Sequence, residues 1–275
     1  MATNTATKGS NWSDVTAWDL GHVPADGEDV ALAGYTMVVD VTTIPATGTL
    51  ASITSVGSAG KMTLALNTVG STTINCTTIT CGTANGFITV SGATANTFTL
   101  TTTSIAGGSA ADANAIVYSS TGPATITAAL SSGTAANATG LYTATAGVDI
   151  TVIGSVTAIT SHGIRNSGTG TVKITGNVTG SATAGVHGAW NATTGTVNVT
   201  NGTLTAGAFA GSQAVLNGST GNITLTNCNV VDTTASLAVS GKPPVWVPGT
   251  RNYHQLPNGT RLYTKRRRLD GGIAA

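Results

Sequence analysis

The second half of this sequence repeats itself. Short segments open at glycines that recur at intervals of about 25 residues, namely Gly122, Gly147, Gly170, Gly195 and Gly221. After each glycine, Val, Ile or Leu occupies alternate positions, which is typical of a strand with one buried face and not of a helix. One such segment is too short to bury its apolar side alone. Stacking of successive copies is therefore favoured, as in a parallel β-helix.

The aliphatic residues fall into register between copies. The predicted core ladder consists of Ile150, Val152, Val172, Ile174, Val197, Val199, Ile223 and Leu225. A second apolar position follows a few residues later, at Leu130, Val156, Val178, Leu204 and Val230. A third is a small residue before an aliphatic one, as in Gly163-Ile164 and Gly185-Val186. Three short strands per turn are thus predicted, in an all-β, right-handed parallel β-helix, and each buried aliphatic side chain contributes about 1.5–3 kcal/mol.

Upstream, the repeat is weaker but still present. Gly34, Gly60 and Gly86 are evenly spaced at nearly the same interval, and an apolar run follows each of them. The next step, from Gly86 to Gly122, is longer, and we interpret it as one turn plus a loop of about ten residues near Gly107-Gly108-Ser109. The pattern predicts about eight turns over residues 35–241, and stacking at about 4.8 Å per turn would give a column about 40 Å tall.

The two ends differ in charge. Residues 1–40 contain six acidic side chains and one lysine, residues 41–241 contain three of each sign, and residues 242–275 contain seven basic side chains and one aspartate. Because an open β-helix end exposes unpaired strand edges, the ends need their own coverings. We therefore expect a cap over residues 1–34 and a basic docking tail over residues 242–275.

The acidic end carries a recognisable series of residues. It reads Gly9-Ser10-Asn11-Trp12-Ser13-Asp14, then Trp18, Gly21, Pro24, Gly27 and Asp29-Val30, and ends at Val38-Val39-Asp40. This series resembles the entry module of many β-helix proteins of tailed bacteriophages and of bacterial surfaces. The resemblance implies that Trp12 and Trp18 plug the first turn and that residues 27–30 lead the chain into its first rung. We favour cap packing over sugar binding for the two tryptophans.

The basic end starts at Lys242-Pro243-Pro244 and includes a turn at Pro257-Asn258-Gly259 between two short apolar runs. We expect a small hairpin of residues 252–256 and 260–264. The candidate docking residues are Trp246, Arg251, Tyr253, Arg261, Tyr263, Lys265, Arg266, Arg267 and Arg268. A solvated tail and a segment that docks on an acidic surface both fit this pattern. Nucleic acid fits less well, because the remaining chain offers no basic face to extend the patch.

Residue types that carry catalysis are scarce. The acids of residues 41–241 are Asp112, Asp149 and Asp232, and they are too far apart in sequence to form the carboxylate pair of a glycosidase. Aligning Gly163-Ile164 with Gly185-Val186 places Arg165 beside His187, with His162 nearby, and we expect exposed polar side chains there. We predict no catalytic residues, metal site or cofactor.

Compartment signals are few. Cys76, Cys81 and Cys228 lack metal-binding spacing and are expected to be small, buried, reduced side chains. No apolar run is long enough for a membrane span, and the N-terminal residues do not form a secretory signal.

Three functions compete. The first is a structural virion protein of a tailed phage, made in the bacterial host cytoplasm, in particular a homotrimeric capsid decoration (cement) protein that contacts virion proteins such as the major capsid protein. The second is a tailspike or tail fibre that recognises surface polysaccharide. The third is an ice-binding β-helix, suggested by Thr125-Ile126-Thr127 and Thr224-Leu225-Thr226 but opposed by Lys173-Ile174-Thr175 and Asn198-Val199-Thr200 in between.

Overall fold

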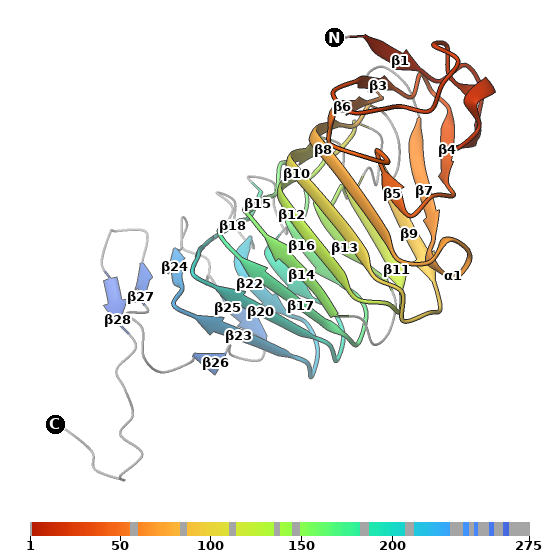
Figure 1. Cartoon of the computed structure of the whole chain (residues 1–275). Helices are drawn as coiled ribbons and strands as arrows, with labels where there is room; N and C mark the ends of the chain where they lie inside the picture. Colours follow the sequence, from red (N-terminus) through yellow and green to blue (C-terminus); the bar gives the residue numbers. More distant parts are fainter. Residues whose placement is uncertain are drawn as a thin grey trace, which may run out of the picture.

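The protein is a column of stacked strands, with its N-terminus at one end and its last strands at the other (Figure 1). The computed structural model describes residues 2–55, 60–82, 87–109, 114–134, 138–144, 149–181, 187–206 and 212–231, and the backbone of residues 239–241, 245–246, 253–255 and 261–263. Successive turns contribute strands to three faces, which confirms the predicted all-β parallel β-helix of about eight turns. The helical elements among these described residues are a 3-10 turn, η1 (Val15–Ala17), and one α-helical turn, α1 (Leu66–Val69).

We number the faces in the order in which one turn visits them. The first face consists of β5 (Thr43–Ile44), the leading halves of β8 (Thr72–Thr80), β10 (Phe98–Ala106) and β12 (Ala124–Ser131), then β14 (Asp149–Ile153), β17 (Thr171–Thr175), β20 (Thr196–Thr200), β23 (Asn222–Thr226) and β26 (Val245–Trp246). The second face consists of β1 (Thr3–Thr5), β3 (Asp29–Ala31), β6 (Leu50–Thr54), the trailing halves of β8, β10 and β12, then β15 (Val156–Thr157), β18 (Val178–Thr179), β21 (Thr203–Thr205), β24 (Asn229–Val231) and β27 (Tyr253–Gln255). The third face consists of β2 (Ser10–Asn11), β4 (Thr36–Val39), β7 (Lys61–Ala65), β9 (Ile88–Gly92), β11 (Ile116–Ser120), β13 (Leu141–Thr143), β16 (Ile164–Asn166), β19 (His187–Asn191), β22 (Gln213–Asn217) and β25 (Val239–Gly241).

The core of the column is filled by aliphatic side chains stacked in register. On the first face Ile150 pairs with Val172, which pairs in turn with Val197 and then Ile223. A parallel column holds Val152, Ile174, Val199 and Leu225. All eight side chains are buried. On the second face, Leu130, Val156, Val178, Leu204 and Val230 form the equivalent column.

A ladder of buried asparagines marks the corner from the third face to the first. The amide of Asn166 donates to Asn191 (3.1 Å), and the amide of Asn191 donates to Asn217 (3.2 Å). The same Asn191 amide also donates to the Gly195 carbonyl four residues later (2.7 Å), and Asn217 binds the Gly221 carbonyl in the same way (2.8 Å). Two of the recurring glycines, Gly195 and Gly221, are therefore acceptors of the ladder.

A second corner explains another set of glycines. The chain bends from the first face to the second at Gly154 and Gly176, whose φ angles are 144° and 141°. A Cβ at Gly176 would lie 2.4 Å from the carbonyl oxygen of Gly154 in the turn before. Both the positive φ and the close stacking exclude larger residues, so this corner tolerates glycine and little else.

The predicted loop near Gly107 is wrong. The amide of Ser109 binds the Gly82 carbonyl in the turn before (2.8 Å), and the amide of Thr134 in the turn after binds the Gly108 carbonyl (3.0 Å). These residues therefore occupy a regular corner. The longer interval before Gly122 arises because Gly34 and Gly60 precede third-face strands, whereas Gly122 precedes a first-face strand, so the interval is one turn plus the passage between two faces.

The ladders extend beyond residues 35–241 at both ends. At the N-terminal end β1 pairs with β3 in parallel, so Gly27 (φ 76°) and residues 28–30 lead into the second rung of the second face and not the first. At the other end β26 and β27 continue the first and second faces. The predicted hairpin is present: β28 (Arg261–Tyr263) pairs antiparallel with β27.

Candidate functional site

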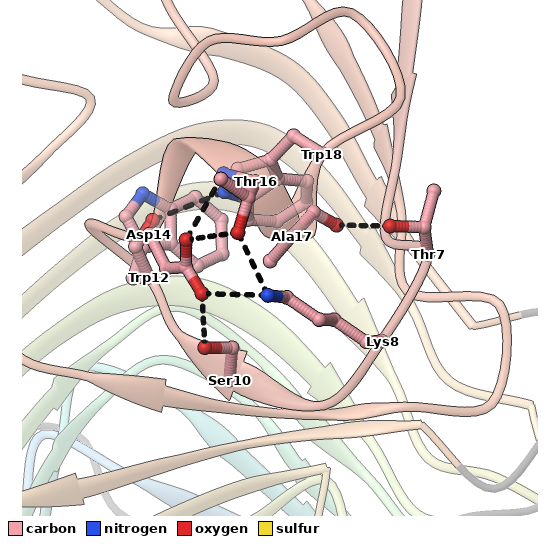
Figure 2. A network of polar contacts seen from close by, with 8 residues as sticks. All are labelled: Thr7, Lys8, Ser10, Trp12, Asp14, Thr16, Ala17 and Trp18. Atoms are coloured by element: carbon pink, nitrogen blue, oxygen red, sulfur yellow. Dashed lines mark hydrogen bonds and ion pairs between the residues drawn. The ribbon is translucent and has the colours of Figure 1, made fainter.

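The N-terminal end is closed by a compact cap built around two tryptophans (Figure 2). Trp12 and Trp18 are 1% and 3% exposed, and their rings meet edge to face with centroids 5.0 Å apart. The ring nitrogen of Trp18 donates to the Trp12 carbonyl (3.0 Å). Both side chains are almost fully buried, so both pack as the predicted cap would require.

The acidic residues of the cap hold its loops in place. Asp14 accepts from the hydroxyls of Ser10 (2.6 Å) and Thr16 (2.7 Å) and pairs with Lys8 (3.2 Å), as Figure 2 shows. The hydrogen bonds from Ser10 and Thr16 hold the pKa of Asp14 well below its usual range, and their effect is larger than the opposing effect of burial. Each of the other five carboxylates of residues 1–40, Asp19, Asp26, Glu28, Asp29 and Asp40, also accepts a hydrogen bond within residues 2–55.

A cleft of about 410 Å³ lies between the cap and the first turn. It is lined mainly by apolar groups, among them Trp12, Val23 and Pro24 from the cap and Ala46 from the turn below. Its polar side chains are the hydroxyls of Thr42, Thr43 and Thr47. Hydroxyls alone supply neither an acid–base pair nor metal ligands, so the cleft suggests no reaction.

The predicted docking residues at the basic end lie at the limit of what the structure describes. Trp246 is in β26, Tyr253 in β27, and Arg261 and Tyr263 in β28, for which the backbone is described. Arg251, Lys265, Arg266, Arg267 and Arg268 lie outside the described residues.

The most unusual arrangement of side chains is on the outer side of the third face. We call it the third-face patch: Tyr142, His162, Arg165, His187, Trp190 and Gln213. Arg165 stands between Tyr142 in the turn before and Trp190 in the turn after, with which it is in register. Its guanidinium carbon lies 5.3 Å from the Tyr142 ring centroid and 4.7 Å from that of Trp190. The cation is thus held between two aromatic rings, an attraction that increases as water is excluded.

Two histidines complete the patch. The rings of His162 and His187 stack with centroids 5.2 Å apart, and His162 also meets Trp190 at 4.7 Å. The backbone N–H of His187 donates to Nδ1 of His162 (3.0 Å), so that nitrogen carries no proton. Burial lowers the pKa of His162 to about 3, with smaller contributions from His187 and Arg165, and burial lowers the pKa of His187 to about 4.

The sequence-based interpretation of this region needs two corrections. Ile164 pairs with Ala189, so Gly163-Ile164 aligns with Gly188-Ala189 and not with Gly185-Val186, of which both residues lie outside the described part. Arg165 therefore neighbours Trp190, and His187 neighbours His162. Nor are these side chains simply exposed: His187 is 7% exposed, and the exposure of Arg165 is intermediate.

Several polar atoms of the patch lack partners. Among the described residues, six buried side-chain nitrogen or oxygen atoms have no hydrogen bond. Four of the six belong to the patch: Nε of Arg165, Nδ1 of His187, Nε1 of Trp190 and Oε1 of Gln213. Each such atom costs about 1–3 kcal/mol, so their concentration in one place calls for an explanation.

The outer side of the first face is different in character. Two adjacent columns run along it, one at Thr73, Thr99, Thr125, Thr151, Lys173, Asn198 and Thr224, the other at Asn75, Thr101, Thr127, Ile153, Thr175, Thr200 and Thr226. Most positions are threonine, but Lys173 and Asn198 interrupt one column and Ile153 interrupts the other. The register therefore upholds the sequence argument against an unbroken threonine surface of the ice-binding type.

Other chemistry is sparse in the part of the chain that the structure describes. No group of three or more His, Cys, Asp or Glu side chains there is arranged to hold a metal ion. Cys76, Cys81 and Cys228 are buried and not joined by a disulfide, and burial raises the pKa of each thiol, to about 11 for Cys76. No described helix has the length and hydropathy needed to cross a membrane.

Comparison of the chain with protein-family models, curated proteins and solved structures found no significant match to any of them.

Proposed function

We propose that this chain is a structural protein of a tailed-phage virion, a trimeric pillar that decorates the capsid and attaches through its ends, without enzymatic activity. The observation that carries the proposal is the in-register stacking of three strand ladders along about eight turns. Such a column is stiff and presents a regular outer surface, as a spacer or cement element requires. The entry-module resemblance of residues 9–40 supports the phage assignment.

The first face is the surface we assign to contact between copies. Its outer columns consist mainly of threonine, whose short side chains leave the sheet flat. Near the middle of the face Ile153 is 46% exposed. An exposed aliphatic side chain on a flat, nearly uncharged face suits contact with another copy of the same face, since burial of apolar area drives association.

The ends are the surfaces we assign to attachment. Six carboxylates of residues 1–40 belong to one end, and residues 242–275, whose charged residues are mainly basic, contribute the last strands β26 to β28 at the other. Opposite charge at the two ends suits attachment to different surfaces, for example a capsid shell and a neighbouring virion protein. The tailspike function is the alternative, because a glycan-binding site on one flank would fit it equally well.

Immunogold electron microscopy of particles from the phage that encodes this chain tests the proposal. Label on the heads is the expected result, and loss of head label after truncation of residues 264–275 would place the attachment in the basic tail. Label on the tails would favour the tailspike alternative, and particles without label would contradict a virion role altogether.

A further inference from the structure

We propose that the third-face patch binds the anionic group of an acidic glycan, a carboxylate or a phosphate, with Arg165 as the residue that contacts it. The inference goes beyond the proposed structural role and does not depend on where the pillar sits on a particle. It rests on the geometry of the patch alone.

Among the described residues, none compensates the charge of Arg165. The ion pairs among the described residues join Lys8 to Asp14, His22 to Glu28 and Lys173 to Asp149. Arg165 forms no ion pair and no hydrogen bond with a described residue. A guanidinium has five N–H donors, and the buried Nε–H of Arg165 has lost hydration that nothing in this part of the chain replaces. An anionic oxygen ligand would replace it.

The guanidinium of Arg165 is already positioned. Rings lie on both of its sides, 5.3 Å and 4.7 Å from the guanidinium carbon, so its plane is held before any ligand arrives. A fork of fixed orientation binds carboxylate or phosphate through two parallel hydrogen bonds. Because little side-chain freedom remains to be lost, binding costs less entropy than at a flexible surface arginine.

The rest of the patch adds polar atoms and ring surface around Arg165. Nε1 of Trp190 and Nδ1 of His187 are further polar atoms without partners, and Oε1 of Gln213 is an unpartnered acceptor in register with His187. Tyr142 and Trp190 are partly exposed and offer apolar ring surface beside the cation. Aromatic surface combined with a few polar groups around one charge is typical of a ligand site. A sugar acid or sugar phosphate presents the matching features: an anionic group, hydroxyls and an apolar C–H face.

The test measures dissociation constants for the full chain by ligand-observed nuclear magnetic resonance. The probes are oligogalacturonate for the carboxylate, mannose 6-phosphate for the sugar phosphate, inorganic phosphate, and maltohexaose as a neutral sugar. The informative variant is Arg165→Gln, and Arg165→Lys keeps the charge but removes the fork. Lys173→Gln is the matched control, since it removes one positive charge from the first face. Thermal unfolding establishes that each variant is folded.

We expect at least one acidic sugar to bind and maltohexaose not to bind. Arg165→Gln should weaken that binding about ten-fold or more, as expected when charge-assisted hydrogen bonds are lost, and Lys173→Gln should leave it within about two-fold. Arg165→Lys should fall between Arg165→Gln and the unaltered chain.

Three results would overturn the proposal. One is no binding of either acidic sugar at about 10 mM, ten times the Kd of a weak ligand of about 1 mM. The second is equal affinity of Arg165→Gln and the unaltered chain. The third is inorganic phosphate binding as tightly as mannose 6-phosphate while oligogalacturonate does not bind, because the sugar would then contribute nothing.

Discussion

Replacing Asn191 by alanine tests how much the buried asparagine ladder stabilises the column. Asn191 is fully buried and takes part in three hydrogen bonds: it donates to Gly195 and Asn217 and accepts from Asn166. Asn191→Ala removes all three and leaves a carbonyl, a side-chain oxygen and an amide without these partners. At about 1–3 kcal/mol for each buried group, less some relaxation, we expect the free energy of unfolding to fall by about 3–6 kcal/mol.

The structure offers a matched control on the outside of the column. Asn227 donates to Asn201 (2.8 Å) in the same turn-to-turn manner, but this pair is exposed. Asn201 has a φ of 55°, a conformation that glycine adopts freely. Asn201→Gly should therefore change the free energy of unfolding by no more than about 0.5 kcal/mol.

Urea unfolding followed by circular dichroism, at fixed protein concentration, measures both variants. A loss below about 1 kcal/mol for Asn191→Ala, or a loss equal to that of Asn201→Gly, would refute the claim that the ladder is a main source of stability. A double variant adds a second check. Asn166→Ala combined with Asn191→Ala should cost less than the sum of the single changes, because the orphaned amide of Asn166 is then absent.

Three further predictions concern the corners, the patch and the first face. Gly176→Ala should lower the free energy of unfolding by about 3 kcal/mol in the same urea assay, because residue 176 has a positive φ and a Cβ there would lie 2.4 Å from a carbonyl oxygen. An unchanged urea midpoint would contradict the packing of that corner. The depressed pKa values of His162 and His187 keep both side chains neutral in the folded chain, whereas the unfolded chain takes up protons below about pH 6.5. The free energy of unfolding should therefore fall as the pH drops from about 6.5 towards 4, by about 2 kcal/mol per histidine at pH 5. A His162→Gln/His187→Gln variant should lose this pH dependence in thermal unfolding. Ile153→Lys should convert the proposed trimer to a monomer in size-exclusion chromatography with light scattering. The control Ile159→Lys, at a site that is 43% exposed and lies outside the strands, should leave the trimer intact. A monomeric unaltered protein would disprove the trimer.

The repeat in the sequence is sufficient to predict the column, and it leaves specific details undetermined. Alternating Val, Ile and Leu after a glycine has one physical explanation, a half-buried strand. The inward-facing residues of successive first-face strands can therefore be aligned from the sequence. Glycine itself is ambiguous, because two different corners require it. A glycine before a third-face strand can therefore be aligned with a glycine before a first-face strand. The interval between two such glycines is longer than one turn, and it predicts a loop where a regular corner exists.

Sequence analysis locates only part of the third-face patch, for a related reason. The small-then-aliphatic pattern occurs twice in quick succession, at Gly185-Val186 and at Gly188-Ala189, and the structure uses the pair with the smaller aliphatic residue. The asparagine ladder does leave a signal: Asn166, Asn191 and Asn217 recur once per turn, and each lies four residues before a glycine of the repeat. Asparagine at such a position is easily assigned to a turn, but here it is inside the column.

The direction of the backbone hydrogen bonds gives the column unequal mechanical properties. Strands run across the axis, so the bonds between turns point along it and hold each turn to the next. A force that pulls the two ends apart acts on the bonds of one turn at a time and should unwind the column rung by rung at low load. A compressive or lateral force is instead shared among many turns at once. A molecule built this way is suited to bear pressure and to brace a surface, and poorly suited to act as a tether.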